Sequence, residues 1–150
     1  MGANRTVKVL FDTSVIIAAV LPKHPSHTPC FAELQAAELN QIQGYLSTHS
    51  LAEVYSVMTR MPSQPRMSPQ EAQSLLQRCL QYLEAVSLET VDYQAVIAQM
   101  AALNLRGGGI FDALIAQAAL KVSADQLLTL NSSHFTRLGT VIAQMVRVPT

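Results

Sequence analysis

Short apolar runs alternate with longer amphipathic stretches along the chain, which predicts strands alternating with helices. The run 7–11 is almost continuously apolar and indicates a strand that is buried on both faces. Further short apolar runs predict strands at 44–46, 85–88, 126–130 and 146–148. Helical periodicity or start signals predict helices over 13–21, 30–42, 50–60, 69–83, 90–103 and 110–120. This alternation favours an α/β fold with an open, mostly parallel sheet.

Local residues set several of the predicted boundaries. Ser68, Pro69 and Glu71 together are typical of a helix start, with a cap, a proline in the first turn and the acid of a capping box. The proline-containing segments 22–29 and 61–67 are expected to be loops. Thr90 is expected to cap the helix that follows it.

Composition supports a single folded domain over residues 1–150. The chain is 49% hydrophobic and 13% charged, which excludes a disordered chain, and it lacks an apolar run long enough to cross a bilayer. Two cysteines give no disulfide framework and suggest buried thiols in a cytosolic protein. Ten basic and ten acidic residues cancel. This balance disfavours a tight, non-specific DNA binder but leaves room for an enzyme that holds a few phosphates locally.

Three of the scarce acids stand where a strand or loop meets a helix: Asp12, Glu53 and Asp112. A charge near a core is costly unless it is paired or bound to metal. In parallel sheets ligands bind beyond the carboxyl ends of the strands, where Asp12 and Asn131 are both expected. Carboxylates without cysteines suit Mg²⁺ or Mn²⁺. We therefore expect an oxygen-lined cation site that acts on phosphates.

Each acid also has a purely structural interpretation. Asp12 could cap a helix, Glu53 could complete a capping box with Ser50, and Asp112 could favour the helix dipole. The coincidence of three such acids is what favours a site. His49, four residues before Glu53, could join a metal pair, although a cap or surface residue is the simpler interpretation.

Longer motifs surround these acids and carry a family resemblance. They are Phe11-Asp12-Thr13-Ser14-Val15-Ile16, Glu53 in a mid-chain helix, the segment 107–116, and the segment 127–135. With them, nearly the whole chain resembles the PIN domain family, and specifically the VapC-type ribonuclease toxins of type II toxin–antitoxin systems. The resemblance implies a three-layer α/β/α PIN-like fold with a four- to five-stranded parallel sheet.

The resemblance also implies roles for individual residues. Asp12, Glu53 and Asp112 would be the catalytic and metal-binding acids, supported through hydrogen bonds by Thr13, Ser14 and Thr129. Family members often read Thr-x-Asn-x-x-Asp-Phe near the end of the motif set. This chain keeps Asn131 but has His134 where the fourth acid would stand. A neutral imidazole there could ligate Mn²⁺ or contact a phosphate, and it suits Mg²⁺ poorly.

We therefore expect a Mg²⁺- or Mn²⁺-dependent endoribonuclease that hydrolyses phosphodiesters with metal-activated water. The family implies an RNA substrate, a cognate antitoxin protein and a homodimer. Because the fourth acid is missing, the alternative is a catalytically weakened PIN-fold binding module, and a third option is a DNA or phosphomonoester substrate. Arg60 and Arg66 flank a proline-rich loop and could touch RNA backbone or belong to a solvated loop.

Overall fold

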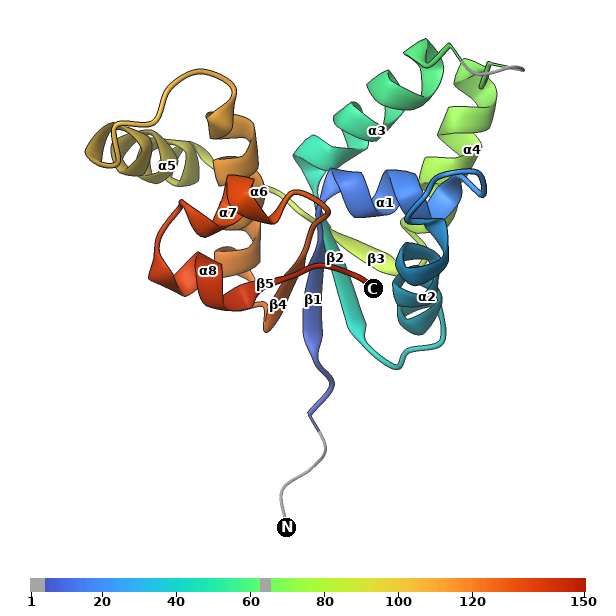
Figure 1. The fold of residues 1–150 in the computed structure, drawn as a ribbon, viewed down its shortest axis with the longest axis horizontal. Coiled ribbons are helices and arrows are strands. Elements are labelled where there is room, and N and C mark those ends of the chain that lie inside the picture. The colour runs from blue at the N-terminus through green and yellow to red at the C-terminus, as the bar shows by residue number, and fades with distance from the viewer. Residues whose placement is uncertain (1–4, 63–65) are drawn as a thin grey trace.

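The computed structural model describes residues 5–62 and 66–150, which form helices on both sides of one sheet (Figure 1). All strand pairs are parallel and the strand order is β3-β2-β1-β4-β5. The strands are β1 (Lys8–Phe11), β2 (Gln43–Ser47), β3 (Leu83–Val86), β4 (Gln126–Leu128) and β5 (Val146–Arg147). The predicted three-layer fold with a parallel sheet is confirmed.

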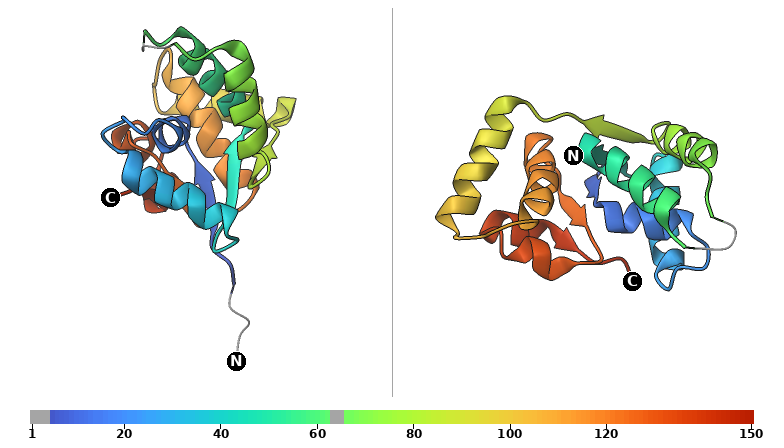
Figure 2. Two further views of the ribbon diagram at one scale, coloured as in Figure 1. Left: turned by 90° about the vertical axis from the view of Figure 1, so that its right-hand side faces the viewer. Right: turned by 90° about the horizontal axis from the view of Figure 1, so that it is seen from above.

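Two sets of helices cover the two faces of the sheet (Figure 2). One set is α1 (Thr13–Val20), α2 (His27–Glu38), α3 (Thr48–Arg60) and α4 (Pro69–Cys79). The other is α5 (Thr90–Ala102), α6 (Gly109–Lys121), α7 (Ser132–Thr136) and α8 (Thr140–Met145). The strand arrangement therefore produces two hydrophobic cores, one on each side.

The central strand explains why the apolar pattern of β1 is continuous. Val9 and Phe11 pack into the core beside α1 to α4, whereas Leu10 packs into the core beside α5 to α8. All three side chains are fully buried. Neighbouring side chains on a strand point to opposite faces, so a strand with a core on both sides needs an apolar residue at every position.

Several predicted boundaries were wrong by a few residues. The helix expected over 30–42 begins at His27, because Pro29 lies in its first turn, where a missing N–H group costs little. It ends at Glu38, and Asn40 then takes a positive φ of 58°. The helix expected to reach Leu83 ends at Cys79, and Leu83 instead starts β3, which shifts that strand two residues toward the N-terminus.

Some predicted helix starts are confirmed and others are wrong. Ser68 and Glu71 form the predicted capping box, with reciprocal bonds of 3.1 Å. Thr90 is the first residue of α5 rather than its cap, which is Glu89. The short helices α7 and α8 were not predicted, since each spans less than two turns and shows little periodicity.

Cys30 and Cys79 are both buried and unbridged, as expected. Burial raises the pKa of the Cys79 thiol to about 11, so this thiol stays protonated and unreactive at neutral pH. Among the residues that the structure describes, helices with the length and apolar character required to cross a bilayer are absent.

The close contact of β2 with its neighbours generates a stability prediction. A Cβ at Gly44 would clash with Leu83 Cδ2 and lie 3.1 Å from Ala37 Cβ, and both side chains are buried. We expect Gly44→Ala to lower the free energy of unfolding by about 1–3 kcal/mol in urea titrations, the usual cost of overpacking. The control is Gly108→Ala, where φ is −65° and a Cβ meets nothing within 4 Å. Equal stability of the two variants would contradict the packing argument.

Candidate active site

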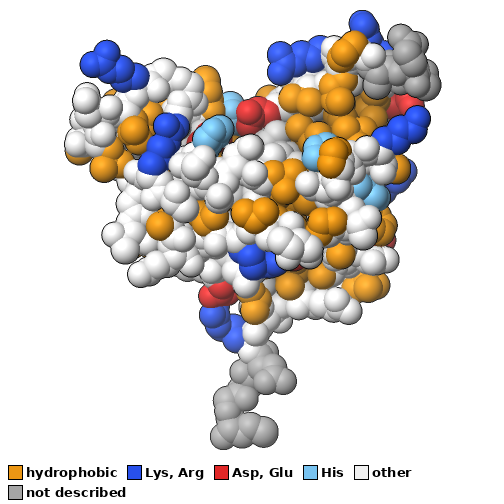
Figure 3. All heavy atoms as spheres, viewed as in Figure 1, with side chains coloured by type: hydrophobic (Ala, Val, Ile, Leu, Met, Phe, Trp, Pro, Cys, Tyr) orange, Lys and Arg blue, Asp and Glu red, His pale blue; other side chains and the backbone are white. Residues whose placement is uncertain are grey.

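The predicted site residues converge at the carboxyl ends of the central strands. Asp12 follows β1 directly, Thr129 follows β4, and α3 continues from β2 without a loop. Asp112 lies in the first turn of α6, on the other side of the sheet. In the space-filling view, acidic and histidine side chains gather in a hollow between the two sets of helices (Figure 3). We call the region around Asp12, Glu53, Asp112 and His134 the notch.

Asp12 is the most deeply buried of the acids, with 3% of its surface exposed. Its Oδ2 accepts hydrogen bonds from Ser14 Oγ at 2.7 Å and from Thr129 Oγ1 at 2.8 Å. Although Asp12 occupies the N-cap position of α1, its side chain makes no capping hydrogen bond. The capping interpretation of this acid is therefore wrong, and its carboxylate is oriented by two hydroxyl groups instead.

Backbone groups hold these two hydroxyls in place. The Leu130 N–H donates to Ser14 Oγ at 3.1 Å, and the Asn131 N–H donates to Thr129 Oγ1 at 2.9 Å. Each hydroxyl thus accepts from the backbone and donates its own proton to Asp12. The Asn131 side chain itself is exposed and makes no capping bond to α7. The segment after β4 is thereby fixed against the end of β1.

Burial dominates the ionisation of Asp12. Removal from water raises the pKa of its carboxyl group, and the nearby Asp112 charge raises it further. The hydrogen bonds from Ser14 and Thr129 lower the pKa but do not outweigh burial. The ionised carboxylate is consequently costly in the folded chain, and a cation beside it would relieve that cost.

Glu53 is oriented by Thr13 rather than by a helix cap. Thr13 Oγ1 lies 2.8 Å from Glu53 Oε1 and 2.8 Å from Ser50 Oγ. A hydroxyl has one proton and an ionised carboxylate only accepts, so Thr13 donates to Glu53 and Ser50 donates to Thr13. The cap of α3 is Ser47, whose Oγ accepts from the His49 N–H. The capping box expected between Ser50 and Glu53 is therefore wrong, because the helix begins before Ser50.

The pKa of Asp112 is raised by burial more than it is lowered by the basic residues nearby. Its Oδ2 lies 3.2 Å from Nδ1 of His134, the residue that stands where a fourth acid was expected. Burial raises the pKa of Asp112 and the Glu53 charge adds to this, while His134 and Arg137 lower it. Arg137 can approach because residue 109 is glycine: a Cβ there would lie 2.7 Å from its guanidinium.

His49 and Phe111 form a pair that the sequence analysis did not foresee. Their rings are parallel within 1°, with centroids 5.2 Å apart. His49 Nε2 is buried, lies 3.5 Å from Glu53 Oε1 and has no hydrogen-bond partner among the described residues. His49 is thus neither a cap nor a free surface residue. No local sequence pattern signals this pairing, because residues 49 and 111 are far apart along the chain.

The donor set fits a hydrated Mg²⁺ or Mn²⁺ ion. Within residues 5–62 and 66–150, three carboxylate, imidazole or thiol side chains do not come together tightly enough to enclose a single ion. Mg²⁺ usually takes only one or two carboxylates and keeps several waters or substrate phosphates. The buried Asp12 carboxylate, which has hydroxyl partners but no cationic one at hydrogen-bond distance, meets that requirement.

Charge is unevenly distributed over this neutral chain. Three ion pairs neutralise basic side chains away from the notch: Arg5–Asp125, Lys121–Asp92 and Arg147–Glu33. Lys and Arg side chains also stand on both sides of the notch (Figure 3). Arg60, Arg106 and Arg137 form no ion pair with the described part of the chain. The net charge of zero is therefore compatible with locally unneutralised positive side chains near the notch.

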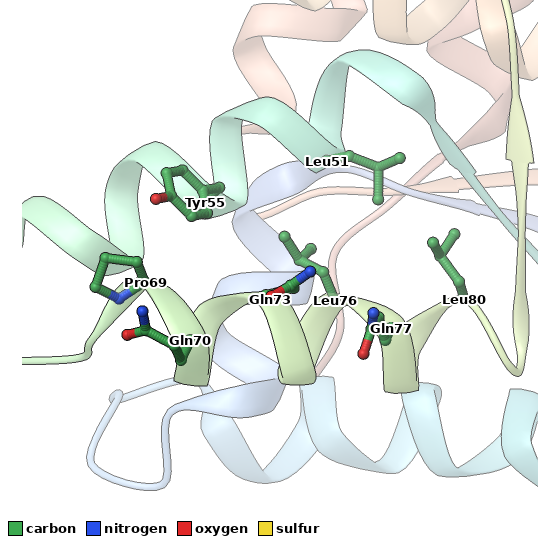
Figure 4. A pocket seen from close by; sticks show the side chains of 8 residues that line it. All are labelled: Leu51, Tyr55, Pro69, Gln70, Gln73, Leu76, Gln77 and Leu80. Carbon is green, nitrogen blue, oxygen red and sulfur yellow. The ribbon is translucent and has the colours of Figure 1, made fainter.

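A second hollow, the α3–α4 groove, lies between helices α3 and α4 (Figure 4). It has a volume of about 500 Å³ and is lined by Leu51, Tyr55, Pro69, Gln70, Gln73, Leu76, Gln77 and Leu80. Its lining contains no acid, histidine or basic residue. Because it offers no charged or imidazole side chain, it is a weaker candidate for a cation site than the notch.

Comparison with known proteins shows the family of this chain. A family model described as a PIN domain matches residues 8–133. Ribonuclease VapC27 of Mycobacterium tuberculosis is 36% identical over 115 residues, which cover 76% of this chain and 78% of that protein. Ribonuclease VapC40 of the same species is 28% identical over 118 residues, covering 79% of this chain and 82% of that protein.

Solved structures show a similar fold. VapBC2 from Rickettsia felis, crystallised with a promoter DNA fragment, gives a TM-score of 0.68 at 21% identity, covering 96% of this chain and all of that one. Mycobacterium tuberculosis VapC20, titled a Sarcin-Ricin loop cleaving toxin, gives 0.61 at 13% identity, covering 79% of this chain and 86% of that one. At these identities the likeness concerns the fold.

Burial of Asp12 predicts how the free energy of unfolding depends on pH when a chelator keeps the protein free of metal. Because the folded-state pKa is raised, stability is lost as pH rises from the ordinary aspartate pKa toward the folded one. We expect Asp12→Asn to be more stable than the wild type at pH 7, with the difference closing below about pH 4. Urea unfolding of both proteins across this range measures it. A wild type that is the more stable protein at pH 7 would contradict the cost assigned to this charge.

Proposed function

The chain belongs to the PIN domain family, and on that premise we propose that it is a divalent-metal-dependent endoribonuclease, the toxin of a toxin–antitoxin pair. The observation that carries the proposal is the buried Asp12 carboxylate, which is oriented by Ser14 and Thr129 and lies near the charge of Asp112, which in turn lies near that of Glu53. The ribonuclease relatives at 36% and 28% identity support the activity. Two cores on one shared sheet support a single PIN-like domain.

The acids have different environments and therefore different proposed tasks. Asp12 and Asp112 would hold a Mg²⁺ or Mn²⁺ ion, because one is buried and the other half-buried. Such an ion supplies charge neutralisation at the phosphodiester and makes a bound water more acidic. The Glu53 side chain is 37% exposed and one of its oxygens is held by Thr13, so it is placed to accept a proton from the attacking water.

His134 gives the alternative function its support. Its Nδ1 lies 3.2 Å from Asp112 Oδ2, so the imidazole competes with a metal ion for this carboxylate. A site with this partner has one acid fewer than the family usually provides. The alternative is therefore a PIN-fold protein that binds RNA and cleaves it weakly or not at all.

The proposed partners follow from the same site. Three carboxylates in a partly buried notch favour a cationic group, and an arginine from a cognate antitoxin would satisfy them as metal does. Several structures with this fold are toxin–antitoxin complexes, including VapBC from Salmonella typhimurium with a TM-score of 0.65. We also propose a homodimer that acts on RNA in the cytoplasm.

Cleavage of RNA tests the activity. We expect the purified protein to cut structured RNA with Mn²⁺, and Asp12→Asn and Asp112→Asn to lower the rate at least about 100-fold, because each removes a carboxylate that would hold the cation at the phosphate. Gel analysis of end-labelled RNA gives the rates. Ser123→Ala, a substitution outside the notch, is the matched control. Equal rates for all four proteins would refute the assignment.

Calorimetric titration with Mn²⁺ separates the enzyme from the binding module. We expect measurable binding by the wild type, and its loss in Asp12→Asn, since that change removes the buried carboxylate. His134→Asp should tighten binding, because it restores an acid beside Asp112. RNA binding without any detectable Mn²⁺ binding or cleavage would favour the binding module.

A further inference from the structure

We propose that a groove beside the notch is an RNA subsite in which one unpaired base stacks on Phe111 and an adjacent phosphate meets Arg60. This inference deepens the proposed ribonuclease function and rests on it. The groove has a volume of about 260 Å³ and runs along α3 to the start of α6. We call it the α3–α6 groove, and its lining is His49, Glu53, Ser56, Val57, Arg60 and Phe111.

One face of α3 supplies most of this groove. His49, Glu53, Ser56 and Arg60 are three or four residues apart, a spacing that places them on the same side of a helix. Glu53 belongs to the notch and Arg60 closes the helix about 10 Å further along its axis, at 1.5 Å per residue. The groove therefore leads directly away from the reacting centre.

Phe111 is a large apolar side chain that is not packed into either hydrophobic core. Its side chain is 49% exposed, whereas the residues at 113–116 of the same helix are all buried. A large exposed aromatic ring thus stands directly before a proposed catalytic acid, at the end of the helix that lies beside the notch. The ring is nevertheless held in a fixed orientation by its parallel stack on His49. A ring fixed on one side and open to solvent suits stacking by a base.

His49 places a ring nitrogen without a hydrogen bond in the described structure beside Phe111. This Nε2 atom is buried and makes no hydrogen bond in the described structure, although Glu53 Oε1 lies 3.5 Å away. An unpartnered buried polar atom is costly, so a group that enters the groove and supplies a partner is favoured. The edge of a base or a ribose hydroxyl carries such groups.

Arg60 provides the charge that a nucleic acid needs. It is exposed, lies in the last turn of α3 and forms no ion pair with residues that the structure describes. A guanidinium group binds phosphate through two parallel hydrogen bonds. Stacking and phosphate contacts are both tolerant of sequence, and stacking requires a base that is not already paired. The substrate class is therefore an unpaired RNA segment, such as a loop.

The chain offers a matched control for Phe111. Phe31 is also an exposed phenylalanine, at 44%, and it also stacks on a histidine, with its ring centroid 5.3 Å from that of His27. It lies on α2, outside the α3–α6 groove. Phe111→Leu and Phe31→Leu remove the same aromatic face, and only the first should affect RNA.

The test measures cleavage and stacking with single-stranded oligonucleotides that carry 2-aminopurine next to the cut. We expect Phe111→Leu to raise KM roughly tenfold, with a smaller effect on kcat, and to abolish the quenching that stacking causes. Phe111→Tyr should restore both values, and Phe31→Leu should match the wild type. Circular dichroism melting confirms that each variant folds.

Salt dependence tests the phosphate contact. Arg60→Ala should reduce the slope of log affinity against log salt by about one phosphate contact, while Arg78→Ala, at the end of α4, should leave it unchanged. These affinities are measured in the Asp12→Asn background, where cleavage does not interfere.

Failure of the subsite and failure of the ribonuclease assignment give different results. If the wild type cuts RNA but Phe111→Leu keeps its KM and its quenching, the subsite is overturned and the nuclease assignment stands. If the wild type neither cuts nor binds the oligonucleotides, both are overturned. If Phe111→Tyr fails to rescue a folded Phe111→Leu defect, stacking is not the cause and the subsite is overturned.

Discussion

The rest of the site depends on one buried charge at the end of the central strand. Asp12 follows β1, which pairs with β2 on one side and β4 on the other. Its carboxylate is almost fully buried, and its closest partners are hydroxyl groups rather than cations. Hydroxyls orient an ionised carboxylate without neutralising it, so the folded chain keeps an affinity for positive charge at this position. The roles proposed for the remaining acids and the surrounding arginines follow from their positions relative to Asp12.

The notch is shared between the two layers of helices. The layer of α1 to α4 provides Glu53 and His49, while the opposite layer provides Asp112, His134 and Phe111. Contacts beyond the carboxyl ends of the strands join the two layers of helices, as in the stack of His49 on Phe111. A cation held between the layers would therefore meet a carboxylate from each. Lys and Arg side chains on both sides of the notch (Figure 3) show that zero net charge does not exclude local positive charge there.

Hydrophobic pattern was sufficient for the sheet and the main helices, because burial on one or both faces imposes a period that survives in the sequence. It also located Asp12 and Asp112, since a lone acid among apolar residues is conspicuous. The start of α3 was misplaced because Ser47 and Ser50 are equally good caps in sequence, and only the pairing of β2 decides between them. The stack of His49 on Phe111 joins residues far apart in the chain, so no local pattern could reveal it.

The hydrogen bond between Thr129 and Asp12 spans 117 residues, and this separation has a consequence for the order in which the protein is made. Asp12 leaves the ribosome long before Thr129 exists. Until β4 has been synthesised and has docked beside β1, the carboxylate lacks one of its two hydroxyl donors and Asp112 has no fixed neighbour in α7. Pairing of such distant segments is a late event in folding. A nascent chain that has not yet paired β4 with β1 thus carries Asp12, Glu53 and Asp112 without all of the contacts that orient them, so the notch is assembled only when the chain is nearly finished.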